Sequence, residues 1–178
     1  MRFAAFLRGV NVGGNKKIDM ATLRHLLEDA GMTRVATVLQ SGNAVFDYGG
    51  PERAALAARI EAAIETGFGF SPTVLIRSLR ELERAVAADP LGEMATDPAR
   101  HLLGFLGESP TKASIRAAES ESTGDDLVRV IGSHLYMWCP NGISRSPLFK
   151  VNFDRVLGTP VTMRNWNTVA KVVDLLRS

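Results

Sequence analysis

Apolar and polar positions along the first fifty residues predict a strand, a helix and a hairpin. Residues 3–10 form an apolar run that is typical of a buried strand. A helix is expected over residues 20–30, because apolar side chains recur on one side of it and Asp19 is a good N-cap. Residues 34–39 and 43–48 are β-type runs joined by a short polar turn, which indicates a hairpin.

The pattern continues with a helix, a short strand and another helix. The second helix is expected to begin at Pro51 and to place aliphatic residues at a spacing of four on one side. These residues are Leu56, Ile60 and Ile64. A short strand follows at residues 73–76, and Ser78 and Glu81 then form a capping box for the third helix. The first six elements match the β-α-β-β-α-β order of a ferredoxin-like module, with helices on one face of an antiparallel sheet.

The same order of elements restarts after a proline- and glycine-containing stretch at residues 89–99. The second set begins with a strand (101–106), a helix that Ser109 caps and that begins at Pro110, and a hairpin (127–131 and 134–138). A helix that Ser146 caps then runs from Pro147 to Gly158, with Phe149, Phe153 and Val156 on one side. A strand (161–164) and a final helix follow, and the final helix has Val169, Val172, Val173 and Leu176 on one side.

We therefore expect an α+β protein of two tandem ferredoxin-like (βαββαβ-type) modules, with antiparallel sheets and helices on one face. The N-terminal module spans residues 1–90 and the C-terminal α+β module residues 99–178. No residue-level identity is evident between the halves, so a single mixed sheet built from both remains an alternative.

The composition restricts the class of protein but does not indicate a function. The chain has 178 residues, of which 46% are hydrophobic and 22% charged, so it can bury a core without a metal or disulfide. Its one cysteine, Cys139, cannot form an intrachain disulfide, which favours a reducing compartment and a cytoplasmic location. No export signal or membrane-length apolar stretch is visible. The formal net charge of +2 permits an anionic partner without requiring one.

The glycine-rich loop at residues 9–17 is the first candidate site. The backbone N–H groups of Gly13 and Gly14 can point at one anion, and Lys16 and Lys17 add positive charge. The loop is not a Walker A motif, because Asn15 stands between the last glycine and the first lysine. The alternative is a glycine turn with solvated lysines.

The turn between the two hairpin strands is the second candidate. Gln40, Ser41 and Asn43 place amide and hydroxyl groups together there, although such residues usually hydrogen-bond their own backbone. If the first and third strands are antiparallel neighbours, we expect this turn and the glycine-rich loop to lie a strand's length apart.

The third candidate is a polar and aromatic cluster near the C-terminus. Arg164 offers a planar donor fork and Trp166 a stacking face, and either Asn165 or Asn167 is expected to cap the last helix, which carries Lys171. The alternative is a capped helix with Trp166 in the core. The neighbouring Arg145, Lys150 and Arg155 make the last third of the chain locally basic.

The sequence contains no recognisable catalytic motif. None of the three histidines has a partner at metal-ligand spacing, and Cys139 is expected to be a packed thiol. The pair Asp125–Asp126 is expected to be a solvated turn. We therefore assign no catalytic residue and expect neither a metal nor a cofactor.

Three segments resemble the DUF1697 family of uncharacterised bacterial proteins: LRGVNVGGNKKIDMATLRHLLEDAG, VLQSGNAVF and TMRNWNTVAKVVDLL. The resemblance implies an α+β fold with ferredoxin-like features and assigns no catalytic residue. The recurring motifs of the family coincide with Arg8, Asn11, Gly13, Gly14, Lys17, Gln40, Ser41, Gly42, Asn43, Arg164, Asn165, Trp166, Asn167, Thr168 and Lys171. This coincidence favours a site built from the polar clusters.

The leading hypothesis is a module that binds an anionic ligand, either a phosphate-bearing, nucleotide-like small molecule or a nucleic acid. We expect Gly13, Gly14, Lys16, Lys17, Arg164, Asn165 and Trp166 to share one anion-binding surface. An RNA-binding sheet of the RRM type is weakened by Asn43 and Val45, which stand where stacking aromatics belong. The alternatives are an enzyme acting on a phosphate- or carboxylate-bearing substrate, and a protein-interaction module that uses an open sheet face.

Overall fold

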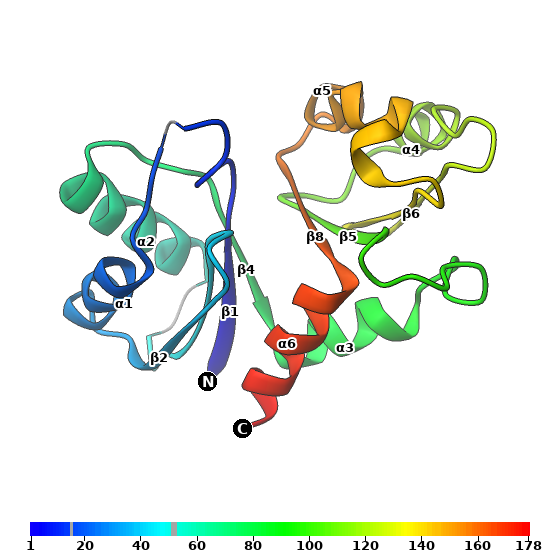
Figure 1. Cartoon of the computed structure of the whole chain (residues 1–178). Coiled ribbons are helices and arrows are strands. Elements are labelled where there is room, and N and C mark those ends of the chain that lie inside the picture. Colours follow the sequence, from blue (N-terminus) through cyan, green and yellow to red (C-terminus); the bar gives the residue numbers. More distant parts are fainter. Residues whose placement is uncertain (15, 51–52) are drawn as a thin grey trace. The chain divides into compact units, whose positions relative to one another are not determined.

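The computed structural model describes residues 1–14, 16–50 and 53–178, so the expected helix start at Pro51 lies outside the described residues. The chain divides into two compact units. The first comprises Met1–Glu83 together with Ala170–Ser178, and the second comprises Arg84–Val169. Each unit contains its own four-stranded antiparallel sheet (Figure 1).

The first unit has the expected order of strands and helices. Its elements are β1 (Arg2–Leu7), α1 (Met20–Asp29), β2 (Thr33–Val38), β3 (Asn43–Asp47), α2 (Arg53–Phe68), β4 (Val74–Ser78) and the beginning of α3 (Leu79–Ala87). The strands lie in the order β2-β3-β1-β4 and all neighbours are antiparallel. Strand β1 is therefore central, between β3 and β4.

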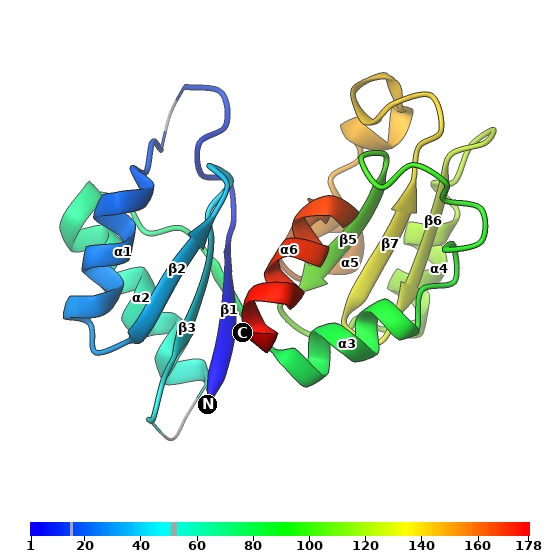
Figure 2. The same ribbon diagram turned by 60° about the horizontal axis from the view of Figure 1, so that its bottom comes forward.

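Helices α1 and α2 cover one face of the first sheet (Figure 2). Alternate residues of β1 point toward them because side chains alternate along a strand, and Phe3, Ala5 and Leu7 belong to the core between sheet and helices. The aliphatic residues expected on one side of each helix are buried there. They are Leu23 and Leu27 of α1 and Leu56, Ile60 and Ile64 of α2.

The second unit repeats this order. Its elements are β5 (His101–Leu106), α4 (Lys112–Glu119), β6 (Leu127–Ile131), β7 (His134–Trp138), two 3₁₀ turns (Ile143–Arg145 and Pro147–Lys150), α5 (Phe153–Leu157), β8 (Val161–Asn165) and the first turn of α6 (Trp166–Arg177). The strand order is β6-β7-β5-β8. Each sheet takes all its strands from one half of the sequence, so the alternative of a single mixed sheet is wrong. The boundary at residues 89–99 stays a prediction.

Both faces of the second sheet are covered, whereas the sequence analysis expected helices on one face. Leu102 and Leu106 of β5 face the core shared with α4 and α5. On the opposite face, the Tyr136 hydroxyl donates a hydrogen bond to the Ala85 carbonyl of α3 at 2.8 Å, and His101 stacks on Trp166 of α6. The expectation was incomplete because β5 is buried on both faces, so each needs a covering layer.

Most expected helix caps are confirmed. Asp19 caps α1, and Ser78 and Glu81 form the capping box of α3. The expected cap at Ser109 is wrong, because Thr111 accepts the hydrogen bond from the Ser114 amide at the start of α4.

The helix expected from Pro147 to Gly158 is instead a 3₁₀ turn followed by the short helix α5. Ser146 caps the turn and Gly158 ends α5 in a left-handed conformation, both as expected. The interruption places Phe149 in solvent, with 69% of its surface exposed, rather than beside Phe153.

Side chains cover the outer edge of strand β6. Two of its backbone N–H groups, those of Val128 and Val130, donate to Ser122 Oγ at 2.9 Å and to Glu119 Oε1 at 3.0 Å. Edge strands with unpaired N–H groups can pair with other chains, so these side chains reduce that possibility at β6. None of the helices in the described part of the chain is long and apolar enough to cross a membrane.

Candidate functional site

The glycine-rich loop and the hairpin turn lie side by side in the first unit. Strand β1 runs antiparallel to β3 and Phe6 lies opposite Asn43, so the end of β1 is next to the beginning of β3. The Leu7 amide donates to the Gly42 carbonyl at 2.8 Å across this junction. The expectation that the two segments lie a strand's length apart is therefore wrong. Antiparallel neighbours bring the end of one strand beside the start of the other.

Asn11 joins the two segments through its side-chain amide. Its Nδ2 donates to the Ile18 carbonyl at 3.0 Å and to the Gln40 carbonyl at 2.6 Å, and its Oδ1 accepts from the Ile18 amide at 2.8 Å. The Asn11 amide also donates to the Lys16 carbonyl at 3.1 Å, which closes the tip of the loop. The loop is thus held at both of its ends and tied to the turn.

Residues with a left-handed (positive φ) backbone are concentrated in these two joined segments. Three of the positive-φ residues other than glycine lie here: Asn11 (φ 55°), Lys16 (φ 54°) and Leu39 (φ 57°). The glycines with positive φ in the same segments are Gly9, Gly13, Gly14 and Gly42. At Gly42 a side chain would also overlap Val10 and Leu7. Such backbone is costly for lysine and leucine, and strained backbone of this kind clusters at functional sites.

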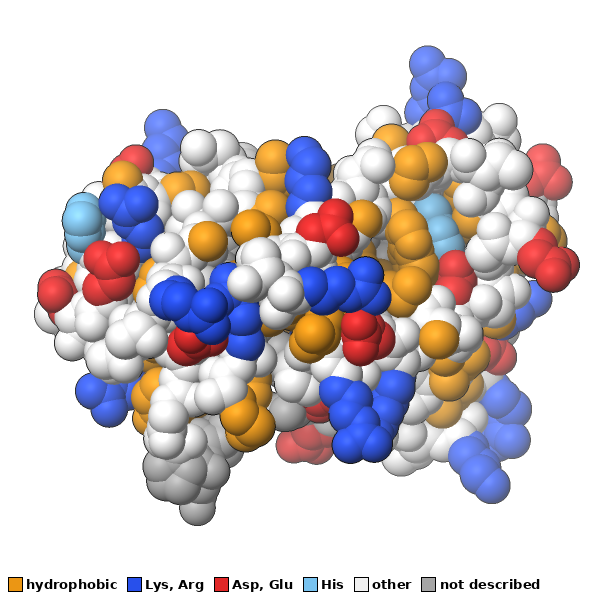
Figure 3. Space-filling model, turned by 90° about the horizontal axis from the view of Figure 1, so that it is seen from below, with side chains coloured by type: hydrophobic (Ala, Val, Ile, Leu, Met, Phe, Trp, Pro, Cys, Tyr) orange, Lys and Arg blue, Asp and Glu red, His pale blue; other side chains and the backbone are white. Residues whose placement is uncertain are grey.

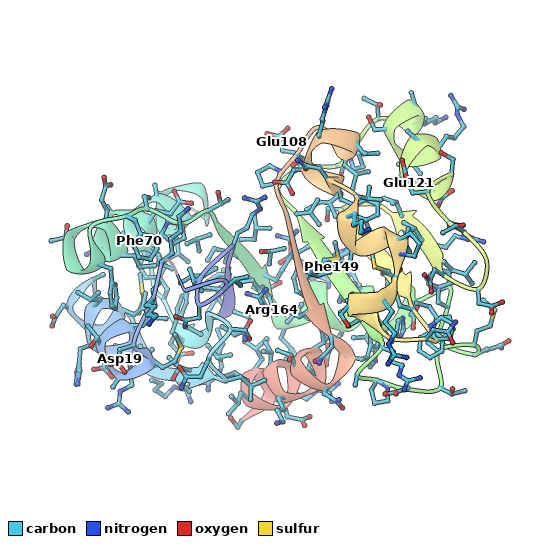
Figure 4. All side chains as sticks on the ribbon, turned by 45° about the horizontal axis from the view of Figure 1, so that its top comes forward. Asp19, Phe70, Glu108, Glu121, Phe149 and Arg164 are labelled. Atoms are coloured by element: carbon cyan, nitrogen blue, oxygen red, sulfur yellow. The ribbon has the colours of Figure 1, made fainter. Side chains whose placement is uncertain are left out.

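A hollow of about 350 Å³ lies beside the loop and is lined by Asn11, Gly14, Lys17, Ile18 and Asp19. Lys17 lines this hollow, and Lys16 and Arg8 are exposed on the same segment of the chain. Asp19 lies at the start of α1 (Figure 4), where it accepts hydrogen bonds from the Thr22 amide and hydroxyl at 2.8 Å each. These bonds, the amide first, lower the pKa of Asp19, so its carboxylate is charged at neutral pH. The N-terminal end of α1 is therefore already capped by a charged carboxylate.

The polar side chains of the hairpin turn mainly support the turn itself. Asn43 is buried, and its Nδ2 donates to the Val38 carbonyl at 2.8 Å and to Ser41 Oγ at 2.9 Å. Gln40 is exposed and meets Asn11 through its main-chain carbonyl. Tyr48 packs against the core on the helix side of the sheet. Direct ligand contacts by these residues stay a prediction.

The polar and aromatic cluster near the C-terminus begins in the second unit. Asn165 is the residue that caps α6, because its Oδ1 accepts from the Thr168 amide at 3.0 Å and from the Thr168 hydroxyl at 2.8 Å. Trp166 is partly buried, its amide donates to the Pro98 carbonyl at 3.0 Å, and its ring stacks on His101. Asn167 and Lys171 are exposed.

His101 and Asp89 form a buried pair that the sequence analysis missed. Their side chains are 3% and 8% exposed, and His101 Nε2 lies 3.4 Å from Asp89 Oδ1, which is long for a hydrogen bond and leaves mainly an electrostatic contact. The His101 ring stacks on Trp166 at 4.1 Å and meets Trp138 edge-on at 6.5 Å. Burial lowers the pKa of His101 despite the opposing effect of Asp89. Burial and the Asp89 charge raise the pKa of Tyr136 to about 12.

Arg164 has a counterpart in the first unit. Arg164 on β8 donates from Nη1 to the Met163 carbonyl at 2.8 Å, and Arg77 on β4 donates from Nη1 to the Ile76 carbonyl at 2.9 Å. The sequences VTMRN and VLIRS are thus the last strands, in chain order, of the two sheets. Each is followed directly by a capped helix. This is a residue-level match between the halves that the sequence analysis did not find. Burial lowers the pKa of Arg164 to about 10.

A family model described as "Protein of unknown function (DUF1697)" matches residues 1–136. The chain belongs to the DUF1697 family. Among solved structures, it is similar to a conserved bacterial protein, SP0830 from Streptococcus pneumoniae, at 26% identity, with a TM-score of 0.76 and 98% of each chain covered. A search of curated proteins finds no match.

In this DUF1697 chain, the glycine loop and the hairpin turn lie side by side, whereas most motif residues near the C-terminus belong to the second unit. The glycine loop and the hairpin turn are in the first unit, whereas Arg164, Asn165 and Trp166 are in the second. The single surface expected to combine Lys17 with Arg164 stays a prediction.

The described residues of this DUF1697 protein contain no group of three or more His, Cys, Asp or Glu side chains that could hold a metal ion. On the face drawn in Figure 3, the Lys and Arg side chains that can be seen are interspersed with Asp and Glu.

Proposed function

We propose that this protein binds a small phosphate-bearing ligand in the first unit, at the joined glycine loop and hairpin turn, which we call the loop junction (residues 8–14, 16–19 and 39–42). One observation carries the proposal. The side chain of Asn11 ties the two segments together, and this places Lys17 on the wall of the hollow beside the glycine backbone. Lysine suits a phosphate as a point charge, and glycine N–H groups add donors without a side chain in the way.

The backbone of the loop junction supports the same proposal. Lys16 and Leu39 adopt left-handed conformations that cost free energy for residues with side chains. Strained backbone conformations of this kind persist where the surrounding structure enforces them, as at ligand clamps.

We also infer that each unit is a ferredoxin-like module, since both have β-α-β-β-α-β order and equivalent strand orders. In each, the loop after the first strand lies beside the turn of the central hairpin. Only the first unit carries the GVNVGGNKK sequence in that loop, which favours the first module as the binding module. A cytoplasmic setting fits the single buried cysteine and stays a prediction.

An enzyme is the weaker alternative, because the described groups near the hollow do not supply a general base. Asp19 is the carboxylate in the hollow and its pKa is lowered, so it is a poor proton acceptor. The His101 and Asp89 pair is buried in the second unit and has little access to a substrate.

Isothermal titration with ribose 5-phosphate tests the proposal. Replacing Lys17→Ala removes a charge-assisted contact and should weaken binding by about ten- to a hundred-fold. The folded stability should change little, because Lys17 is exposed.

Lys112→Ala is the matched control, since Lys112 is an exposed lysine on α4 of the second unit. It should leave binding unchanged. Failure of the wild-type protein to bind ribose 5-phosphate or any other phosphate monoester, or equal affinity of the Lys17 and Lys112 variants, would rule the proposal out.

A further inference from the structure

The loop junction exposes two aliphatic side chains next to its cations. Val12 is 70% exposed and Leu39 is 50% exposed. Val12 directly follows Asn11 and Leu39 directly precedes Gln40, and these two residues are joined by the 2.6 Å hydrogen bond from Asn11 Nδ2. The hydrogen bond therefore holds the two aliphatic residues on neighbouring segments, beside the loop that carries Lys16 and Lys17.

The conformation of Leu39 makes its exposure informative. A leucine at φ 57° is an outlier, because left-handed backbone favours glycine and asparagine. A sequence selected only for stability would place one of those residues here. Leu39 instead combines an unfavourable backbone conformation with an apolar side chain that is exposed to water. This combination is typical of a site where binding is maintained at the expense of stability.

We propose that the ligand of the loop junction is a phosphate monoester carrying an apolar or planar group, which lies against Val12 and Leu39 while the phosphate meets Lys17 and the glycine backbone. This inference rests on the proposed function and adds the chemical class of the ligand. A purely polar ligand would leave the two aliphatic side chains in water. A ligand with an apolar part covers them and gains the hydrophobic free energy of that contact.

The order of affinities for three phosphate monoesters tests the inference by isothermal titration. Adenosine monophosphate carries a planar base, n-butyl phosphate an alkyl chain, and ribose 5-phosphate neither. The wild-type protein should bind at least one of the first two about ten-fold or more tightly than ribose 5-phosphate, since a covered aliphatic side chain contributes roughly that factor. Which of the two is preferred distinguishes a planar from an aliphatic group.

Two substitutions then separate the apolar contact from the phosphate contact. Leu39→Asn suits the left-handed backbone, and Val12→Thr keeps the branched shape. Each should reduce the preference for the apolar ester over ribose 5-phosphate several-fold. Leu39→Asn should also raise the melting temperature, so a loss of binding cannot be attributed to unfolding.

Ile131→Thr is the control, because Ile131 is an exposed aliphatic residue of β6 in the second unit. It should leave all three affinities unchanged. If ribose 5-phosphate binds but the three esters bind equally, or if the preference survives in both variants, this inference is overturned while the proposed function stands. If no phosphate monoester binds the wild-type protein, both are overturned.

Discussion

The side chain of Asn11 links the two segments of the loop junction. Asparagine is among the residues that tolerate the φ of 55° observed here, and its amide supplies both donors and an acceptor. An aspartate has the same shape but no donor. In Asn11→Asp, a carboxylate would face the carbonyl oxygens of Ile18 and Gln40, to which Nδ2 now donates. We expect the free energy of unfolding to fall by about 2–3 kcal/mol, measured by urea denaturation.

Gln40→Ala provides the comparison for that prediction. Gln40 is exposed and accepts from Asn11 through its main-chain carbonyl, which alanine retains. Its free energy of unfolding should change by no more than about 0.5 kcal/mol. A similar loss in both variants would mean that the side-chain amide of Asn11 is not what joins the segments.

The sequence could indicate that Asn11, Gly13, Gly14 and Lys17 are candidate binding residues, but it could not indicate how they are arranged. Their residue types predict a turn with donors and positive charge. The left-handed conformations of Lys16 and Leu39 have no sequence signal, because neither residue type favours them. The neighbouring segments impose them, and that information is absent from a local pattern.

At the scale of elements, local hydrogen bonds were predictable and pairings across the sheet were not. Asp19, Ser78 and Ser146 cap their elements as expected, because a cap depends on residues within one turn. The expected cap at Ser109 was wrong because a second cap-forming residue, Thr111, follows Pro110, and the local sequence alone does not rank the two. Trp166 meets His101 because strand register places Leu102 opposite Asn165, and register is fixed by the assembled sheet. Asp89 reaches His101 from the segment between α3 and β5.

The buried histidine at the start of β5 predicts a dependence of stability on pH. Burial lowers the pKa of His101 in the folded protein below its ordinary value of about 6.5. Between that lowered pKa and about 6.5, the unfolded chain binds more protons, so stability rises with pH. The contribution is complete above about pH 6.5 and declines as the pH falls through this window, at no more than about 1.4 kcal/mol per pH unit.

Urea denaturation between about pH 5 and 7.5 measures this slope. His101→Gln should flatten it, whatever its effect on absolute stability, because glutamine does not titrate. His25→Gln serves as the control, since His25 is exposed on α1. An unchanged slope in His101→Gln would show that the buried pair does not titrate as its environment predicts.

The order of elements in the whole molecule was predictable from the sequence, whereas the sharing of helix α6 between the units was not. Hydrophobic periodicity and turn residues gave both sets of strands and helices. Helix α6 is one continuous helix, yet its residues Trp166–Val169 group with the second unit and Ala170–Ser178 with the first. Near its end, Arg2 of β1 donates to the Leu175 carbonyl at 3.1 Å, and Arg177 pairs with Glu83 at 2.9 Å. An apolar helix face in the sequence predicts burial but not which unit buries it.

This shared helix leads to a prediction about the cooperativity of unfolding. Both tryptophans, Trp138 and Trp166, belong to the second unit, so their fluorescence reports on that unit, whereas far-ultraviolet circular dichroism reports on the whole chain. In the wild-type protein we expect the two urea transitions to coincide, because an intact α6 couples the units.

Ala170 is exposed and lies at the division between the two units. Ala170→Pro should therefore break the helix there, at a cost of about 3 kcal/mol, and separate the two transitions. Ala170→Gly, which costs about 1 kcal/mol, should lower both midpoints together. Coincident transitions in Ala170→Pro would show that something other than the continuity of α6 couples the units.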